Sequence, residues 1–199
     1  MDIHYSAKLE RFANQHLKNY LEPSSHHILI ERARSLRSQL QKGEWKFLIP
    51  RDHPLTFKKN KSDLQIDISC KIEGIGSDIL KHNVELQIKS TKEVNSEPII
   101  NFHIDRKIPK KQEPWNHLHI GENDEPRFPF PPMDIILLCE FILINYFPKD
   151  SEKLRKDSGW KEFVIYSQNT FQKEYFQQCR NCIENNNDIT LMEHLLNYP

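Results

Sequence analysis

The middle of the chain reads IINFHID over residues 99–105 and HLHI over residues 117–120. Both runs alternate apolar and polar side chains with the two-residue period of a β-strand. They predict one antiparallel hairpin in which the numbers of paired residues sum to 222, because a slip of one residue would move every side chain to the other face. In this register Ile104 lies opposite Leu118 on the apolar face.

The polar face of the same hairpin gathers the chemically most active side chains of the chain. The predicted register places His103 opposite His119 and Asp105 opposite His117. Imidazoles beside a carboxylate can serve as general acid and base near neutral pH, and the carboxylate fixes the tautomer of one ring. These four residues are therefore candidate catalytic residues.

Basic residues surround this face in the sequence, namely Arg106, Lys107, Lys110, Lys111 and Arg127. Such cations could stabilise a phosphoryl oxyanion, so Arg106 and Arg127 join the candidate catalytic residues. Arg106 and the three lysines also form a local basic patch that could bind nucleic acid.

Two other interpretations of the polar face stay open. Imidazole nitrogens and a carboxylate oxygen could instead hold zinc, although alternating-strand spacing is a weaker signal than paired cysteines. The face could also be an ordinary polar strand surface that lies in water or against a partner, and ten histidines in the chain favour chance clustering. We assign no metal and no cofactor from the sequence.

The hairpin belongs to a larger predicted sheet. Apolar and polar residues alternate over residues 64–72 and again over 84–88, and a short apolar run at 45–49 precedes them. Short connections between alternating segments are typical of antiparallel pairing. The sequence thus predicts an antiparallel meander of four to five strands within residues 45–120.

Helical patterns flank this sheet on both sides. Residues 1–43 predict a pair of amphipathic helices that divide at Pro23, and residues 131–199 predict a helical layer. The helix over 133–147 is apolar nearly all round and should be buried between the sheet and other helices. The order predicts a single α+β domain over residues 1–199, with the C-terminal helices packed on one sheet face.

The pair Cys179 and Cys182 falls in this helical layer, one helical turn apart. No second cysteine pair and no nearby histidine completes a zinc site around them. We therefore expect the two thiols to belong to a buried stripe with Phe176 and Ile183.

Composition narrows the class of protein. The 28 basic and 28 acidic side chains give zero net charge, so no overall field draws nucleic acid or an acidic membrane to the surface. The first residues lack the pattern of a signal peptide, and the apolar run from Ile135 is too short to span a bilayer. Together with four cysteines, these features predict a cytoplasmic protein without a membrane segment.

Three motifs carry a resemblance, namely HIDR at 103–106, WNHLHIG at 115–121 and PRFPFPPMD at 126–134, ahead of an apolar helix. Residues 99–147 resemble an uncharacterised family of bacterial proteins of similar length, associated with phage-defence and mobile-element loci. The resemblance implies a cytoplasmic defence protein whose protein partners are encoded in the same operon. It implies no catalytic activity.

Two functional hypotheses follow. The first is a non-catalytic protein-interaction subunit of a bacterial multiprotein system of the anti-phage defence type, which binds through its open sheet face or its C-terminal helices. The alternative is a metal-independent acid–base nuclease, an RNase-type toxin effector that uses the His/Asp face. Zero net charge and the lack of a phosphate-binding glycine loop favour the first.

Overall fold

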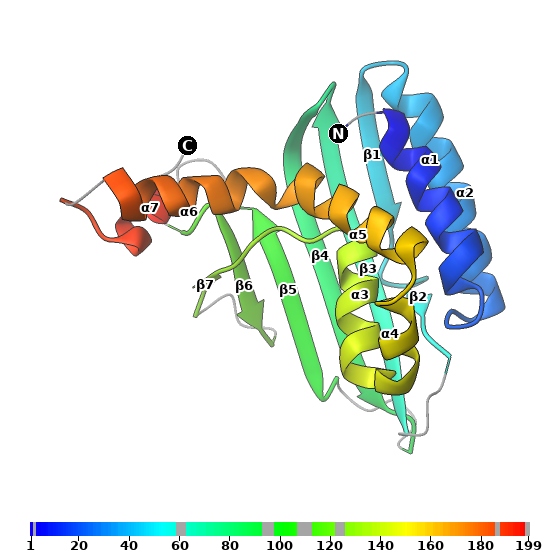
Figure 1. The fold of residues 1–199 in the computed structure, drawn as a ribbon. Coiled ribbons are helices and arrows are strands. Elements are labelled where there is room, and N and C mark those ends of the chain that lie inside the picture. Colours follow the sequence, from blue (N-terminus) through cyan, green and yellow to red (C-terminus); the bar gives the residue numbers. More distant parts are fainter. Residues whose placement is uncertain are drawn as a thin grey trace.

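One antiparallel sheet with helices on one of its faces forms the framework of the molecule (Figure 1). The computed structural model describes residues 1, 3–58, 63–92, 98–106, 113–121, 126–185 and 188–197. The α+β class predicted from the sequence is confirmed, with helices before and after the sheet.

The predicted N-terminal helical pair is present. Helix α1 (Ile3–Phe12) continues into a π-helical turn, η1 (Ala13–Leu17), and α2 (Pro23–Leu40) begins on the proline that predicted the break. Proline suits the first turn of a helix because its missing N–H would have no partner there. Apolar residues at helical spacing form the buried stripe of the pair: Leu9, Phe12, Leu17, Leu29, Ala33 and Leu36.

The sheet has the order β1-β3-β4-β5-β6-β7, and β2 pairs with β3 beside β1. Its strands are β1 (Glu44–Ile49), β2 (Leu55–Thr56), β3 (Leu64–Ile75), β4 (Asp78–Ser90), β5 (Ile100–Arg106), β6 (Asn116–Ile120) and β7 (Phe128–Pro129). All pairs are antiparallel, as the alternation predicted. The count exceeds the predicted four to five because β2 and β7 have two residues each, too few to show a period.

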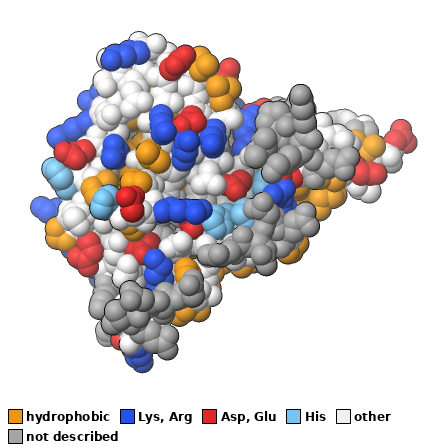
Figure 2. Space-filling model, turned by 180° about the vertical axis from the view of Figure 1, so that it is seen from behind, with side chains coloured by type: hydrophobic (Ala, Val, Ile, Leu, Met, Phe, Trp, Pro, Cys, Tyr) orange, Lys and Arg blue, Asp and Glu red, His pale blue; other side chains and the backbone are white. Residues whose placement is uncertain are grey.

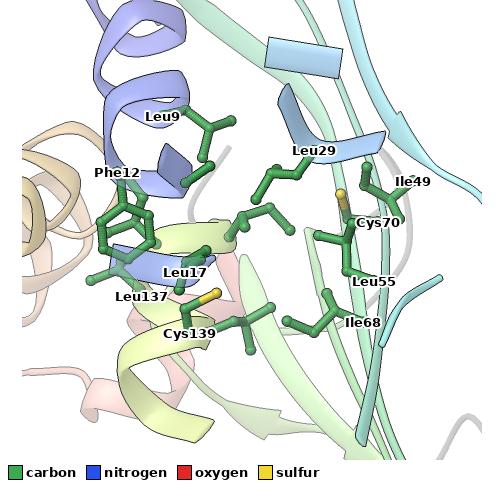
Figure 3. Close-up of a cluster of buried hydrophobic side chains, with 14 of the residues drawn as sticks. Leu9, Phe12, Leu17, Leu29, Ile49, Leu55, Ile68, Cys70, Leu137 and Cys139 are labelled. Atoms are coloured by element: carbon green, nitrogen blue, oxygen red, sulfur yellow. The ribbon is translucent and has the colours of Figure 1, made fainter. Parts of the chain in front are cut away.

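Helix α3 (Ile135–Tyr146) is the centre of the core, as its apolar sequence predicted. Asp134 caps it and accepts a hydrogen bond from the Leu137 amide at 3.0 Å. The same carboxylate accepts hydrogen bonds from the hydroxyls of Tyr5 and Ser167, so it joins α1, α3 and the later helix α5 (Ser158–Phe171). Leu9 and Phe12 of α1 and Leu137 of α3 belong to the buried cluster that Figure 3 shows.

The remaining helices divide into two groups. Helices α4 (Pro148–Leu154) and α5 (Ser158–Phe171) stay with the body, where Trp160 and Phe163 pack on Phe12. Helices α6 (Lys173–Asn185) and α7 (Leu191–Asn197), which we call the C-terminal arm, extend beyond the edge of the sheet at β7 (Figure 1). No described helix is long and apolar enough to cross a membrane.

The structure of the arm corrects the prediction that Cys179 and Cys182 lie in a buried stripe with Phe176 and Ile183. Cys182 is buried and Cys179 is half-buried, but Phe176 and Ile183 are exposed by 54% and 69% rather than buried beside them. The buried side of the arm is small: Trp115, Tyr175 and Leu195 form a cluster separate from the main core, with Cys179 packed against it. Phe176 and Ile183 of α6 therefore have no covering layer within the described residues.

Candidate functional site

The side chains of the candidate site lie on the face of the sheet that the helices leave open. Alternation sends Ile66, Ile68, Val84 and Leu86 to the core and their neighbours to the other side. Figure 2 views the molecule from that side and shows histidines among acidic and basic side chains. This open face is where the sequence predicted the chemistry.

The predicted hairpin register is confirmed. His103 pairs with His119, Asp105 with His117, and Ile104 with Leu118 in the ladder between β5 and β6. Each pair has numbers that sum to 222. The four polar residues therefore share one face of two neighbouring strands, as expected.

The contacts within this group are close. The rings of His103 and His119 stack with centroids 4.7 Å apart and planes 5° from parallel. His119 Nε2 lies 2.9 Å from Asp105 Oδ2, and Asn83 donates a 2.5 Å hydrogen bond from Nδ2 to Asp105 Oδ1. Asp105 thus orients one imidazole and is itself held by the neighbouring strand β4.

His117 is fixed from its outer side. Its Nδ1 lies 3.0 Å from the carbonyl oxygen of Pro114, a distance at which an Nδ1–H donates to that oxygen. Such a bond selects the tautomer with a free lone pair on Nε2. One candidate ligand atom from each of Asp105, His117 and His119 lies within 4.8 Å of the others.

Glu85 of β4 is a member of the site that the sequence analysis missed. Its Oε1 accepts a 2.8 Å hydrogen bond from Gln87 Nε2 and lies 3.6 Å from His103 Nε2. Its Oε2 accepts from Ser69 Oγ at 3.0 Å and lies 2.5 Å from Arg51 Nε. The signal was present, because Glu85 alternates outward on the strand next to the hairpin and pairs with His103.

Burial, hydrogen bonds and nearby charges together shift the pKa values of His103, His117 and Glu85. Loss of solvation lowers the pKa of His103 and of His117 below the ordinary histidine value, and nearby carboxylates offset only part of that effect. Burial by itself would raise the pKa of Glu85. The hydrogen bonds from Gln87 and Ser69 and the charges of His103 and Arg51 outweigh it, so that pKa is lowered. At neutral pH the imidazoles of His103 and His117 are therefore neutral, and Glu85 is ionised.

The structure does not bring all of the predicted cations to this group. Arg106 alternates with Asp105 and so lies on the opposite face, where it donates to the Ile79 carbonyl and stacks over Trp115. Its predicted place beside the histidines is corrected by the same alternation that predicted the hairpin. Lys107, Lys110 and Lys111 lie outside the described residues, so the basic patch stays a prediction.

Arg127 lies near the group, but its ion-pair partner is Glu113 and not one of the four polar residues. It forms an ion pair with the buried carboxylate of Glu113, and both charges act on His117. An arginine in such a pair is partly neutralised, so it is less suited to bind a phosphoryl group than a free one.

Comparison with protein-family models, with curated proteins and with solved structures gives no match.

Proposed function

We propose that this chain is a non-catalytic protein-interaction subunit of a bacterial multiprotein system of the anti-phage defence type. The observation that carries the proposal is the exposed apolar surface of the C-terminal arm. Phe176 and Ile183 lie seven residues apart and so share one face of α6. Met192 of α7 adds to the exposed apolar surface of the arm.

An arm of this kind is characteristic of a binding element. Exposed apolar side chains that gather on one element, rather than scatter singly, mark a surface that a protein partner covers. The arm is attached to the body by a small buried cluster, so its outer face can be buried without disturbing the main core. An amphipathic helix that lays its apolar face into a groove is a common recognition mode.

Burial of the histidine face supports the same conclusion. The exposed fractions of His103, His117 and His119 are 7%, 2% and 6%. A general acid or base has to come within hydrogen-bond reach of its substrate, about 2.6–3.2 Å, or one water away. Side chains so enclosed are better suited to hold the hairpin together than to meet a large nucleic-acid substrate.

The partner follows from the chemistry of the arm and from the resemblance of residues 99–147. It would be a cytoplasmic protein with an apolar groove, encoded in the same operon. The test is co-expression of the full chain with the proteins encoded beside it, followed by capture through a tag at the N-terminus. Phe176→Asp and Ile183→Asp should each lower capture about 30-fold or more, the effect of losing an interface hot spot.

A matched control is Ile75→Asp, which places the same charge at an exposed isoleucine of β3, outside the arm. Capture by this variant should equal that of the unmodified chain. Equal capture by all three variants would contradict the proposed role of the arm.

The second candidate function is the metal-independent acid–base nuclease. The observation in its favour is that the register unites His103, Asp105, His117 and His119, with Asp105 orienting His119. The purified chain would then cleave RNA in the presence of a chelator, and His103→Ala or His119→Ala would lower the rate about 10²–10⁴-fold. A purified chain that cleaves no RNA would exclude this candidate.

A further inference from the structure

Three of the four predicted residues come from positions that suit metal ligation. Asp105 lies on β5, while His117 and His119 lie two apart on β6 and so face the same way. We propose that Asp105, His117 and His119 bind one divalent transition-metal ion, with zinc as the ion of best fit. Two imidazole nitrogens and one carboxylate oxygen are a ligand set that zinc takes, and a fourth position is left for water.

The outer contacts of His117 and Asp105 match those of metal ligands. A ligating histidine usually donates its second ring nitrogen to a carbonyl or carboxylate, which fixes the ring and the tautomer. His117 makes this contact through Nδ1 to Pro114, which leaves Nε2 for a metal. Asp105 is held through Oδ1 by Asn83, which leaves Oδ2 facing His119 Nε2 at 2.9 Å.

The inner atoms are already near the spacing that a metal requires. Ligand atoms about 2.0–2.2 Å from a zinc ion in tetrahedral geometry lie roughly 3.3 Å apart. Oδ2 of Asp105 and Nε2 of His119 are slightly closer than that, and the full set lies within 4.8 Å.

The nearby cations Arg51 and Arg127 pair with carboxylates outside the ligand set, Glu85 and Glu113. The buried Nδ1 of His119 has no hydrogen-bond partner among the described residues. His119 therefore lacks, within the described part of the chain, the outer contact that His117 makes through its own Nδ1.

This inference is independent of the proposed function of the arm, and it competes with the metal-independent nuclease. A metal on Nε2 of both histidines would occupy the nitrogens that acid–base catalysis needs. Loss of metal binding would leave capture of partners by the arm unchanged, so the two proposals fail separately.

The test uses the full chain, purified without a polyhistidine tag and treated with chelator, then titrated with Zn²⁺ by calorimetry. We expect one ion per chain. At a free concentration of 100 Kd the melting temperature should rise by about 5–10 °C, as expected for a ligand that binds only the folded state of a chain of this size. Co²⁺ in place of Zn²⁺ should give the absorption of a tetrahedral nitrogen and oxygen site, without a thiolate charge-transfer band.

The variants His119→Ala and Asp105→Asn should lower the affinity for Zn²⁺ at least 100-fold. His53→Ala removes an exposed histidine on another loop and should leave the affinity unchanged. The double variant Cys179→Ala, Cys182→Ala should also bind normally. No binding of Zn²⁺, binding that the ligand variants leave intact, or binding that disappears with the two cysteines would overturn the proposal. The Co²⁺ spectrum of the unmodified chain decides between nitrogen and sulfur ligands even where a variant fails to fold.

Discussion

The body of the molecule and its C-terminal arm differ in how far they bury their apolar side chains. In the body, the sheet and α1–α5 enclose one continuous core in which Phe12, Leu138 and Ile142 are fully buried. In the arm, a cluster of three buried residues supports α6 and α7, while Phe176 and Ile183 face outward. The same residue types therefore stabilise the fold in one region and present a surface in the other.

Because of this difference, the body should determine the stability of the fold, and the arm should determine the binding of a partner. Burial of apolar area is the main favourable term in folding, and the body forms one continuous buried core without a partner. The arm has apolar area still exposed, and a partner could bury it. Substitutions in the two regions should accordingly change different measurements.

The largest expected effect is in the body. Leu138→Ala removes a side chain that α3 places in the core and should lower the free energy of unfolding by about 2–5 kcal/mol. Urea unfolding followed by circular dichroism measures it. The matched control Leu80→Ala, at an exposed leucine of β4, should stay within about 0.5 kcal/mol. Equal stability of the two variants would show that α3 lies outside the cooperative core.

The next effect concerns the attachment of the arm. The ring of Tyr175 stacks on Trp115 with centroids 6.2 Å apart, and burial raises the pKa of its hydroxyl to about 12. Tyr175→Ala should release the arm locally and leave the body folded. Hydrogen exchange of the α6 amides should become faster, while exchange in β3 and β4 stays slow. Faster exchange throughout the chain would contradict a separate arm.

A pH experiment tests the buried carboxyl group of Asp134 in the body. Burial raises the pKa of Asp134, although hydrogen bonds from Ser167, Tyr5 and the Leu137 amide oppose it. The folded state therefore holds this proton more tightly than the unfolded state. Its contribution to stability is complete below the unfolded carboxyl pKa of about 4 and is lost as pH rises through the raised folded pKa.

Asp134→Asn removes this titration and should flatten that part of the dependence of unfolding free energy on pH. Asp188→Asn, at an exposed position, should follow the unmodified chain. A dependence that Asp134→Asn leaves unaltered would mean that the carboxyl group does not titrate as its burial implies.

The smallest effect on stability is expected at the outer face of the arm. Phe176→Ala should change the free energy of unfolding by no more than about 0.5 kcal/mol, because the side chain is already mostly in water. Phe163→Ala, in α5, removes the same side chain from the core and should cost about 3–5 kcal/mol. A large loss at Phe176 would show that its ring supports the fold after all.

The sequence pattern predicted the parts of the fold and of the candidate site that depend on local alternation, and it missed the parts that depend on tertiary contacts. Alternation favoured the register that pairs His103 with His119, because a slip of one residue would move every side chain to the other face. Two-residue strands such as Phe128–Pro129 carry no period and escaped prediction. Glu85 escaped because its role depends on which strand lies beside the hairpin.

Helix α6 of the arm shows what helical spacing in a sequence cannot predict. Spacing predicted one buried stripe that joins Cys179 and Cys182 to Phe176 and Ile183, but only the cysteines are buried or half-buried. Whether another layer covers such a stripe depends on tertiary structure, which spacing does not contain. Arg106 shows a different error, since alternation alone would have placed it on the face opposite the histidines.

The most direct test of the arm as a binding surface is photo-crosslinking in bacteria that carry the whole operon. A photoreactive benzoylphenylalanine replaces Ile183 in one strain and Ile75, the exposed control in β3, in another. We predict a covalent adduct with a protein of the same operon from position 183 and none from position 75. No adduct from position 183, or equal adducts from both positions, would contradict the account.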